Sequence, residues 1–141
     1  MNSSFVDLHC HLDLYPDFES VIQECEVLKI FTLAVTTTPL AWQKNFDLIR
    51  SKKYVRCALG LHPQLVYQRS HELKLFEKQF EQAKYIGEVG LDAGPQYYKS
   101  FDEQIKVFDR ILNLCKDSGN KILSIHSVRS AARVLALTEK Y

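Results

Sequence analysis

Two histidines near the start of the chain, His9 and His11, are the first residues whose spacing suggests chemistry. They end an apolar run that begins at Ser4 and is typical of a β-strand. Residues i and i+2 of a strand point to the same side, so the two imidazoles are placed to hold one metal ion. The alternative is a chance pair of surface histidines, and the pair alone does not decide between the two.

A carboxylate inside an apolar segment is the second candidate. Glu88 lies within residues 85–91, between Gly87 and Gly90, and Asp92 follows. Burying a carboxylate is costly unless a cation or hydrogen-bond donors accompany it, and glycines let other groups approach the backbone closely. We therefore expect Glu88 to bind metal with Asp92 in support; the alternative is a glutamate at a strand edge, in water.

His126 is the third candidate, because the apolar residues of 121–125 lead to it at a predicted strand end. Alone, a histidine there is more often a core or surface residue. With His9, His11 and Glu88 it would lie at one rim of a parallel sheet, which indicates a metal site. Histidine and carboxylate ligands suit Zn, Mn or Mg, and we expect two divalent ions bridged by Glu88 as the catalytic carboxylate.

The elements that position these residues alternate along the chain. Short apolar runs, each followed by an amphipathic stretch, predict about five βα units. The predicted strands are 4–9, 30–37, 54–61, 85–91 and 121–126; the predicted helical regions are 17–26, 38–49, 66–83, 100–119 and 131–140. Strands separated by helices are largely parallel, so the fold is an open doubly wound sheet or part of a (β/α)8 barrel. Five strands do not close an eight-stranded barrel, so the barrel interpretation leaves about three units absent.

Local signals mark several helix ends. Pro39 after Thr38 suits a first helical turn, Ser100 with Glu103 predicts a capping box, and Gly119 is placed to end a helix.

The length, the net charge and the cysteine content limit which classes of protein this chain can belong to. The 141 residues, 46% of them hydrophobic, predict one globular domain over 1–141. A net charge of +1 excludes an overall positive electrostatic field that would attract nucleic acid. Cys10, Cys25, Cys57 and Cys115 have no CxxC spacing, which favours reduced thiols and a cytoplasmic location. No segment predicts an export signal or a membrane span.

Taken in order, four motifs resemble the TatD family of metal-dependent deoxyribonucleases, and they cover nearly the whole chain. They are His9-Cys10-His11, Gly60-Leu61-His62-Pro63, residues 87–92 (GEVGLD) and His126-Ser127-Val128-Arg129. The resemblance implies a TIM-type barrel that hydrolyses DNA phosphodiesters with two divalent ions. It assigns His9, His11 and bridging Glu88 to one ion, His126 to the other, and His62 and Arg129 to substrate phosphate. From the residues alone, His62 could instead shape a loop, and Arg129 could lie in the first turn of a solvated helix.

A closer resemblance is to the TatD-like component of the bacterial Qat anti-phage cassettes, which implies a role in antiviral defence. Two departures stand out. Ala93-Gly94-Pro95 follow Asp92 where the family commonly has an aromatic residue, and the family's second-half ligands, a His and an Asp, have no counterpart before Tyr141.

Other interpretations remain open at this point. Amidohydrolases and PHP phosphoesterases also begin with His-x-His, although many amidohydrolases carry a lysine where this chain has Glu88. The chain could also be a binding or scaffold subunit that keeps a partial metal site. Unpaired sheet edges would make it self-associate or bind a protein partner in addition to DNA.

Overall fold

The computed structural model describes residues 5–141, so Ser4, the predicted start of the first strand, lies outside the described residues. Five parallel strands form one sheet in the order β1-β2-β3-β4-β5. They are β1 (Val6–Cys10), β2 (Phe31–Val35), β3 (Val55–Leu59), β4 (Tyr85–Asp92) and β5 (Ile122–Val128). The five predicted strands are therefore confirmed, each within a few residues of its predicted bounds.

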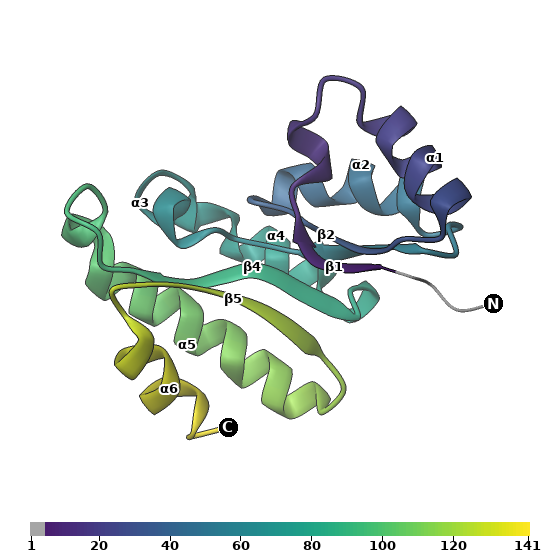
Figure 1. Cartoon of the computed structure of the whole chain (residues 1–141). Coiled ribbons are helices and arrows are strands. Elements are labelled where there is room, and N and C mark those ends of the chain that lie inside the picture. Colours follow the sequence, from purple (N-terminus) through teal and green to yellow (C-terminus); the bar gives the residue numbers. More distant parts are fainter. Residues whose placement is uncertain (1–4) are drawn as a thin grey trace.

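The helices follow the strands in alternation, and Figure 1 shows them around a curved sheet. They are α1 (Phe18–Leu28), α2 (Pro39–Ile49), α3 (Val66–Arg69), α4 (Leu73–Gln79), α5 (Phe101–Ser118) and α6 (Ala131–Thr138). The predicted helical region 66–83 is divided into α3 and α4 by a short 3₁₀ turn at Ser70–Glu72. There the buried Glu72 carboxylate accepts hydrogen bonds from Leu40 N and from the Arg69 guanidinium, which ties this turn to the start of α2.

The strand order decides between the two predicted architectures. A doubly wound sheet reverses its strand order at a switch point, whereas a barrel adds each new strand beside the last. The sequential order found here is that of a barrel segment. Its inner side carries a small cluster of Leu33, Val35 and Ala58 with Tyr85.

The main core lies between the sheet and its helices. Its fully buried side chains include Trp42, Phe76, Ile86, Phe108 and Ile111. One connected apolar cluster contains residues of both α1 and α6. This core fixes β3 and β4 from the outside and thereby positions the residues at their carboxyl ends.

The local helix signals have mixed outcomes. Pro39 stands in the first turn of α2, and Gly119 ends α5 at φ +67°, both as predicted. In addition, Thr38 caps α2 by accepting a hydrogen bond from Ala41 N. The capping box at Ser100 is wrong. The buried Ser100 hydroxyl donates a hydrogen bond to Tyr97 O and accepts one from Gln104 Nε2, so it does not cap the helix.

All four cysteines are free thiols, as expected. Burial raises the pKa of the Cys57 thiol to about 12 and that of Cys115 to about 11. Across residues 5–141, no helix is long and apolar enough to cross a membrane.

Candidate metal centre

Four of the chain's five histidines gather around two carboxylates at the carboxyl ends of β1, β3, β4 and β5. The cluster consists of His9, His11, His62, His126, Glu88 and Asp92. Each was a predicted site residue, and the structure brings all six together.

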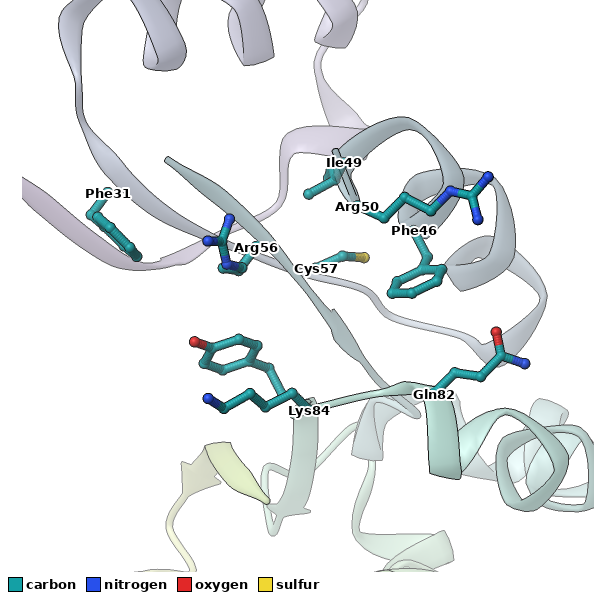
Figure 2. A pocket seen from close by; sticks show the side chains of 9 residues that line it. Phe31, Phe46, Ile49, Arg50, Arg56, Cys57, Gln82 and Lys84 are labelled. Atoms are coloured by element: carbon teal, nitrogen blue, oxygen red, sulfur yellow. The ribbon is translucent and has the colours of Figure 1, made fainter. Parts of the chain in front are cut away.

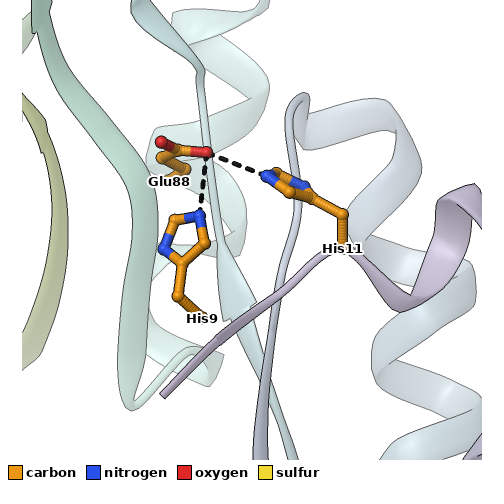
Figure 3. A group of neighbouring side chains, drawn as sticks. All are labelled: His9, His11 and Glu88. Atoms are coloured by element: carbon orange, nitrogen blue, oxygen red, sulfur yellow. Dashed lines mark hydrogen bonds and ion pairs between the residues drawn. The ribbon is translucent and has the colours of Figure 1, made fainter. Parts of the chain in front are cut away.

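Glu88 is the centre of this cluster, and Figure 3 shows His9 and His11 both directed at its carboxylate. His9 Nε2 lies 3.3 Å and His11 Nε2 3.0 Å from Glu88 Oε2. Ligands about 2.1 Å from a zinc ion are separated by roughly 3.0 Å in octahedral and 3.4 Å in tetrahedral geometry. The three atoms therefore have the spacing of a divalent-ion donor set.

The two N-terminal histidines differ in how they are held. His9, in β1, has its Nδ1 2.9 Å from Ser124 Oγ on β5, which leaves Nε2 facing Glu88. His11 stands just beyond β1, and its buried Nδ1 has no hydrogen-bond partner among residues 5–141. A polar atom beyond the imidazole commonly orients a metal-binding histidine, and Ser124 is suited to do so for His9.

His126 lies between the two carboxylates. Its Nδ1 is 2.7 Å from Glu88 Oε1 and its Nε2 is 3.0 Å from Asp92 Oδ2. With Nε2–H donating to Asp92, Nδ1 is left free to bind an ion beside Glu88. Glu88 thus faces His9 and His11 through one oxygen and His126 through the other, which suits a bridging carboxylate.

Asp92 is itself fixed by several donors. Its Oδ2 also accepts a hydrogen bond from Gln64 Nε2, at 2.8 Å, and its Oδ1 accepts one from Gly94 N, at 2.7 Å. Asp92 N–H donates to the fully buried Gln104, whose amide donates back to Asp92 O. The carboxylate that orients His126 therefore has no freedom to turn away.

His62 is chemically distinct from the other histidines. Its Nδ1 accepts a hydrogen bond from Gln64 N, so the neutral ring carries its proton on Nε2, 3.2 Å from Glu88 Oε2. His62, Glu88 and His126 are close enough to hold an ion, but a protonated Nε2 is a donor and not a metal ligand. His62 is thus prepared to donate a hydrogen bond to an anion at the site.

The protonation of the cluster follows from these contacts. Burial would raise the pKa of Glu88, but hydrogen bonds from His126 and His62 and the nearby His9 hold it well below its usual range. The hydrogen bond to Glu88 raises the pKa of His126 against the effect of burial, and Asp92 adds to it. Glu88 is consequently an anion surrounded by imidazoles. A carboxylate must be deprotonated in this way to bind a metal ion.

Close packing of β4 against β5 depends on glycine. A Cβ on Gly90 would lie 2.2 Å from His126 O, and the residue has φ +136°. A Cβ on Gly87 would lie 2.8 Å from Ser124 Cβ. The glycines beside Glu88 therefore let β5 bring His126 and Ser124 to the site, as expected.

Arg129 follows β5 and is exposed, at φ +52°. Within residues 5–141 its guanidinium has no acidic partner within ion-pair distance. It stands at the same end of the sheet as His126, with its charge uncompensated.

Three residues of the cluster's support were missed from the sequence: Gln64, Gln104 and Ser124. Ser124 lies two residues before His126, so strand periodicity could have placed it on the same face. Gln104 is a polar residue at helical spacing within an apolar stripe, which is a signal of a buried partner.

Known protein families include relatives of this chain. The sequence profile of TatD related DNase matches residues 6–141. The chain belongs to the TatD related DNase family. A protein of Danio rerio named as a deoxyribonuclease, tatdn3, is 30% identical over 158 residues, which cover 99% of this chain and 59% of that protein. The human protein named as the 3'-5' RNA nuclease TATDN2 is 27% identical over 162 residues, which cover all of this chain and 20% of that one.

A solved structure gives the same picture of the fold. The TatD homolog YjjV of Escherichia coli superposes with a TM-score of 0.82 at 24% identity, over 99% of this chain and 57% of that one. This likeness confirms the predicted α/β fold, about five βα units of a TIM-type barrel. The chain spans less than two thirds of the length of each of these three proteins.

Proposed function

We propose that this chain carries a divalent-metal site of a nuclease that hydrolyses DNA phosphodiester bonds. The observation that carries the proposal is the convergence of His9, His11 and His126 on the two oxygens of one buried, ionised glutamate, Glu88. Family membership supports the same conclusion.

Each residue has a role in this proposal. His9, His11 and Glu88 hold one ion, and Glu88 with His126 contributes to a second. Bound divalent ions supply a polarised water and stabilise charge on the leaving oxygen. Asp92 fixes the ring of His126, and His62 and Arg129 donate to the substrate phosphate, consistent with the Nε2 proton of His62 and the exposed charge of Arg129.

The direct experiment is a cleavage assay on the purified chain. Single-stranded DNA, double-stranded DNA and RNA are incubated with Mg²⁺, Mn²⁺ or Zn²⁺, beside a chelated control and Glu88→Gln. We expect metal-dependent DNA cleavage that Glu88→Gln abolishes. Cleavage that survives in Glu88→Gln or in chelator would contradict the proposal, and cleavage confined to RNA would contradict the choice of DNA.

A second function, a binding subunit without turnover, rests on one observation. Among residues 5–141, only Glu88 and His126 offer a free ligand atom at the second ion position, because the Nε2 of His62 is a hydrogen-bond donor there. Saturable metal binding without cleavage of any of the three nucleic acids would favour this alternative.

The open sheet suggests a further partner. In the described residues β1 pairs only with β2 and β5 only with β4, and Val6, Leu8 and Ile122 are exposed apolar residues on these edge strands. We propose that residues 1–141 act as one domain, and that additional βα units, from the same or another polypeptide, cover these edges. Self-association in light scattering would support this, whereas a monomer with a high, cooperative melting transition would contradict it.

The biological setting is part of the proposal. The four free thiols support a reducing, cytoplasmic compartment. The resemblance to Qat cassettes supports a role in antiviral defence, which a plaque assay comparing the intact cassette with its Glu88→Gln version would test. Equal plaque numbers would contradict that role.

A further inference from the structure

A hollow lies at the opposite end of the sheet from the candidate metal centre. It has a volume of about 370 Å³ and opens where β3 and β4 begin (Figure 2). β4 pairs with β3 only through Ala58↔Tyr85 and Leu59↔Ile86, so the first residues of β3 extend past the start of β4. The notch left beside them is the hollow, and its size is within the range of small-molecule sites.

The lining of this hollow is cationic. Arg50, Arg56 and Lys84 line it, and no Asp or Glu is among its nine lining residues. Arg50 is partly compensated by Asp47, at 3.8 Å, but in the described residues neither Arg56 nor Lys84 has an acidic partner within ion-pair distance. Two uncompensated charges that line one concavity attract an anion.

Arg56 is held ready for such a contact. Its Nη1 donates to Lys52 O and to Val55 O, each at 2.8 Å, and its guanidinium carbon lies 5.8 Å from the centre of the Phe31 ring. The Nε and Nη2 donors have no protein acceptor among residues 5–141. A guanidinium anchored through one nitrogen loses little freedom when its other donors bind a phosphate.

Aromatic rings complete the lining. Phe31 is 37% exposed, and Phe46 and Tyr85 also line the hollow. Figure 2 shows Arg56 and Lys84 extending toward the side on which Phe31 lies. The exposed part of the Phe31 ring, beside the anchored Arg56 and the exposed Lys84, complements a flat ring that carries an anionic group.

From this combination we propose that the hollow binds a nucleoside monophosphate, with its phosphate on Arg56 and Lys84 and its base against the aromatic rings. No residue of the metal centre lines it. This binding therefore does not depend on the proposed hydrolytic function.

The test is a titration of the chelated full chain with thymidine 5'-monophosphate, followed by calorimetry and by backbone amide NMR shifts. Chelation removes metal-mediated binding at Glu88. We expect saturable binding, with the largest shifts at Arg56, Lys84 and Tyr85. Lys84→Ala, an exposed position, should weaken it about tenfold, the effect of one charge-assisted hydrogen bond, whereas Lys106→Ala on α5 should leave it unchanged.

Two further ligands separate the parts of the proposal. Inorganic phosphate should bind more weakly than the nucleotide, because it lacks the ring, and thymidine should bind more weakly because it lacks the charge. Shifts confined to the residues around Glu88, equal affinity for phosphate and nucleotide, or no effect of Lys84→Ala would each overturn the proposal.

Discussion

β1 and β4 both bring side chains to the candidate metal centre, but the protein holds them in opposite ways. Every residue of β4 after Tyr85 is buried, and Glu88 lies between two strands of the sheet. β1 is an edge strand with four exposed residues and one half-buried residue, and the His9 side chain is 43% exposed. One side of the site is therefore built into the core, whereas the His9 side lies on an exposed edge strand.

This difference has an energetic consequence. Substitutions on the β4 side should affect both folding and metal binding, because the same hydrogen bonds serve both. Substitutions on the β1 side should affect metal binding alone.

Glu88→Gln should lower the affinity for Mn²⁺ by more than about 100-fold, because it removes the negative charge that both ion positions share. Loss of a residue that only supports a metal ligand typically costs about 10- to 100-fold in affinity, and loss of this carboxylate should cost more. Calorimetric titration measures it. Glu77→Gln, which removes only the half-buried acidic partner of Arg110, is the matched control. Equal affinities of Glu88→Gln and wild type would remove Glu88 from the site.

His9→Ala should lower Mn²⁺ affinity by about 100-fold. Loss of a metal ligand should reduce the affinity at least as much as loss of a residue that orients such a ligand. The free energy of unfolding of the metal-free chain should change by less than about 0.5 kcal/mol, because the side chain is half exposed. Urea denaturation measures the second quantity. A destabilisation as large as that of a core substitution would break the comparison between β1 and β4.

Gln104→Met should destabilise the metal-free chain by about 2 kcal/mol, because the buried Asp92 N–H loses its acceptor while the side-chain volume is kept. Urea denaturation again measures the effect. An unchanged midpoint would mean that the β4 side is not held by this hydrogen-bond network.

Asp92→Asn should lower Mn²⁺ affinity about tenfold, because an amide orients the His126 ring less strongly than a carboxylate does. The pKa of His126 should also fall toward its usual value, which NMR titration of the ring protons would follow. A higher His126 pKa in the variant would contradict the assigned contact.

Glu26→Gln should have the smallest effect, about 1 kcal/mol at neutral pH. Its carboxylate accepts the N–H groups of Lys53, Tyr54 and Val55 at the start of β3. Despite the opposing effect of burial, these bonds lower the pKa of Glu26. Its stabilisation is therefore complete above the unfolded-state pKa and is lost as pH falls through the folded-state pKa.

Unfolding free energies of wild type and Glu26→Gln should thus differ at pH 7 and approach each other in acid. A gap that stays constant down to pH 3 would show that the charge of Glu26 has no part in holding β3. Comparing the two proteins at each pH cancels the titration of Glu88 and Asp92.

Much of this arrangement could be predicted from the sequence, for a physical reason. The strands alternate with helices and end in polar residues, so periodicity located them and parallel order placed their carboxyl ends together. The convergence of His9, His11, Glu88 and His126 followed from that geometry.

The remaining details depend on which partner each polar group binds in the folded chain. The proton on His62 Nε2 is set by Gln64 N, and the backbone of Asp92 is fixed by Gln104 on α5. The buried hydroxyl of Ser100 binds Tyr97 O in place of a helix end. Periodicity gives no information about which of several buried partners a polar group will choose.

Anomalous diffraction from crystals soaked in Zn²⁺ would show directly whether this chain gathers a divalent-metal site. We predict a peak about 2.1 Å from His9 Nε2, His11 Nε2 and a Glu88 carboxylate oxygen. No peak within coordination distance of Glu88, or peaks only at other histidines, would contradict the account.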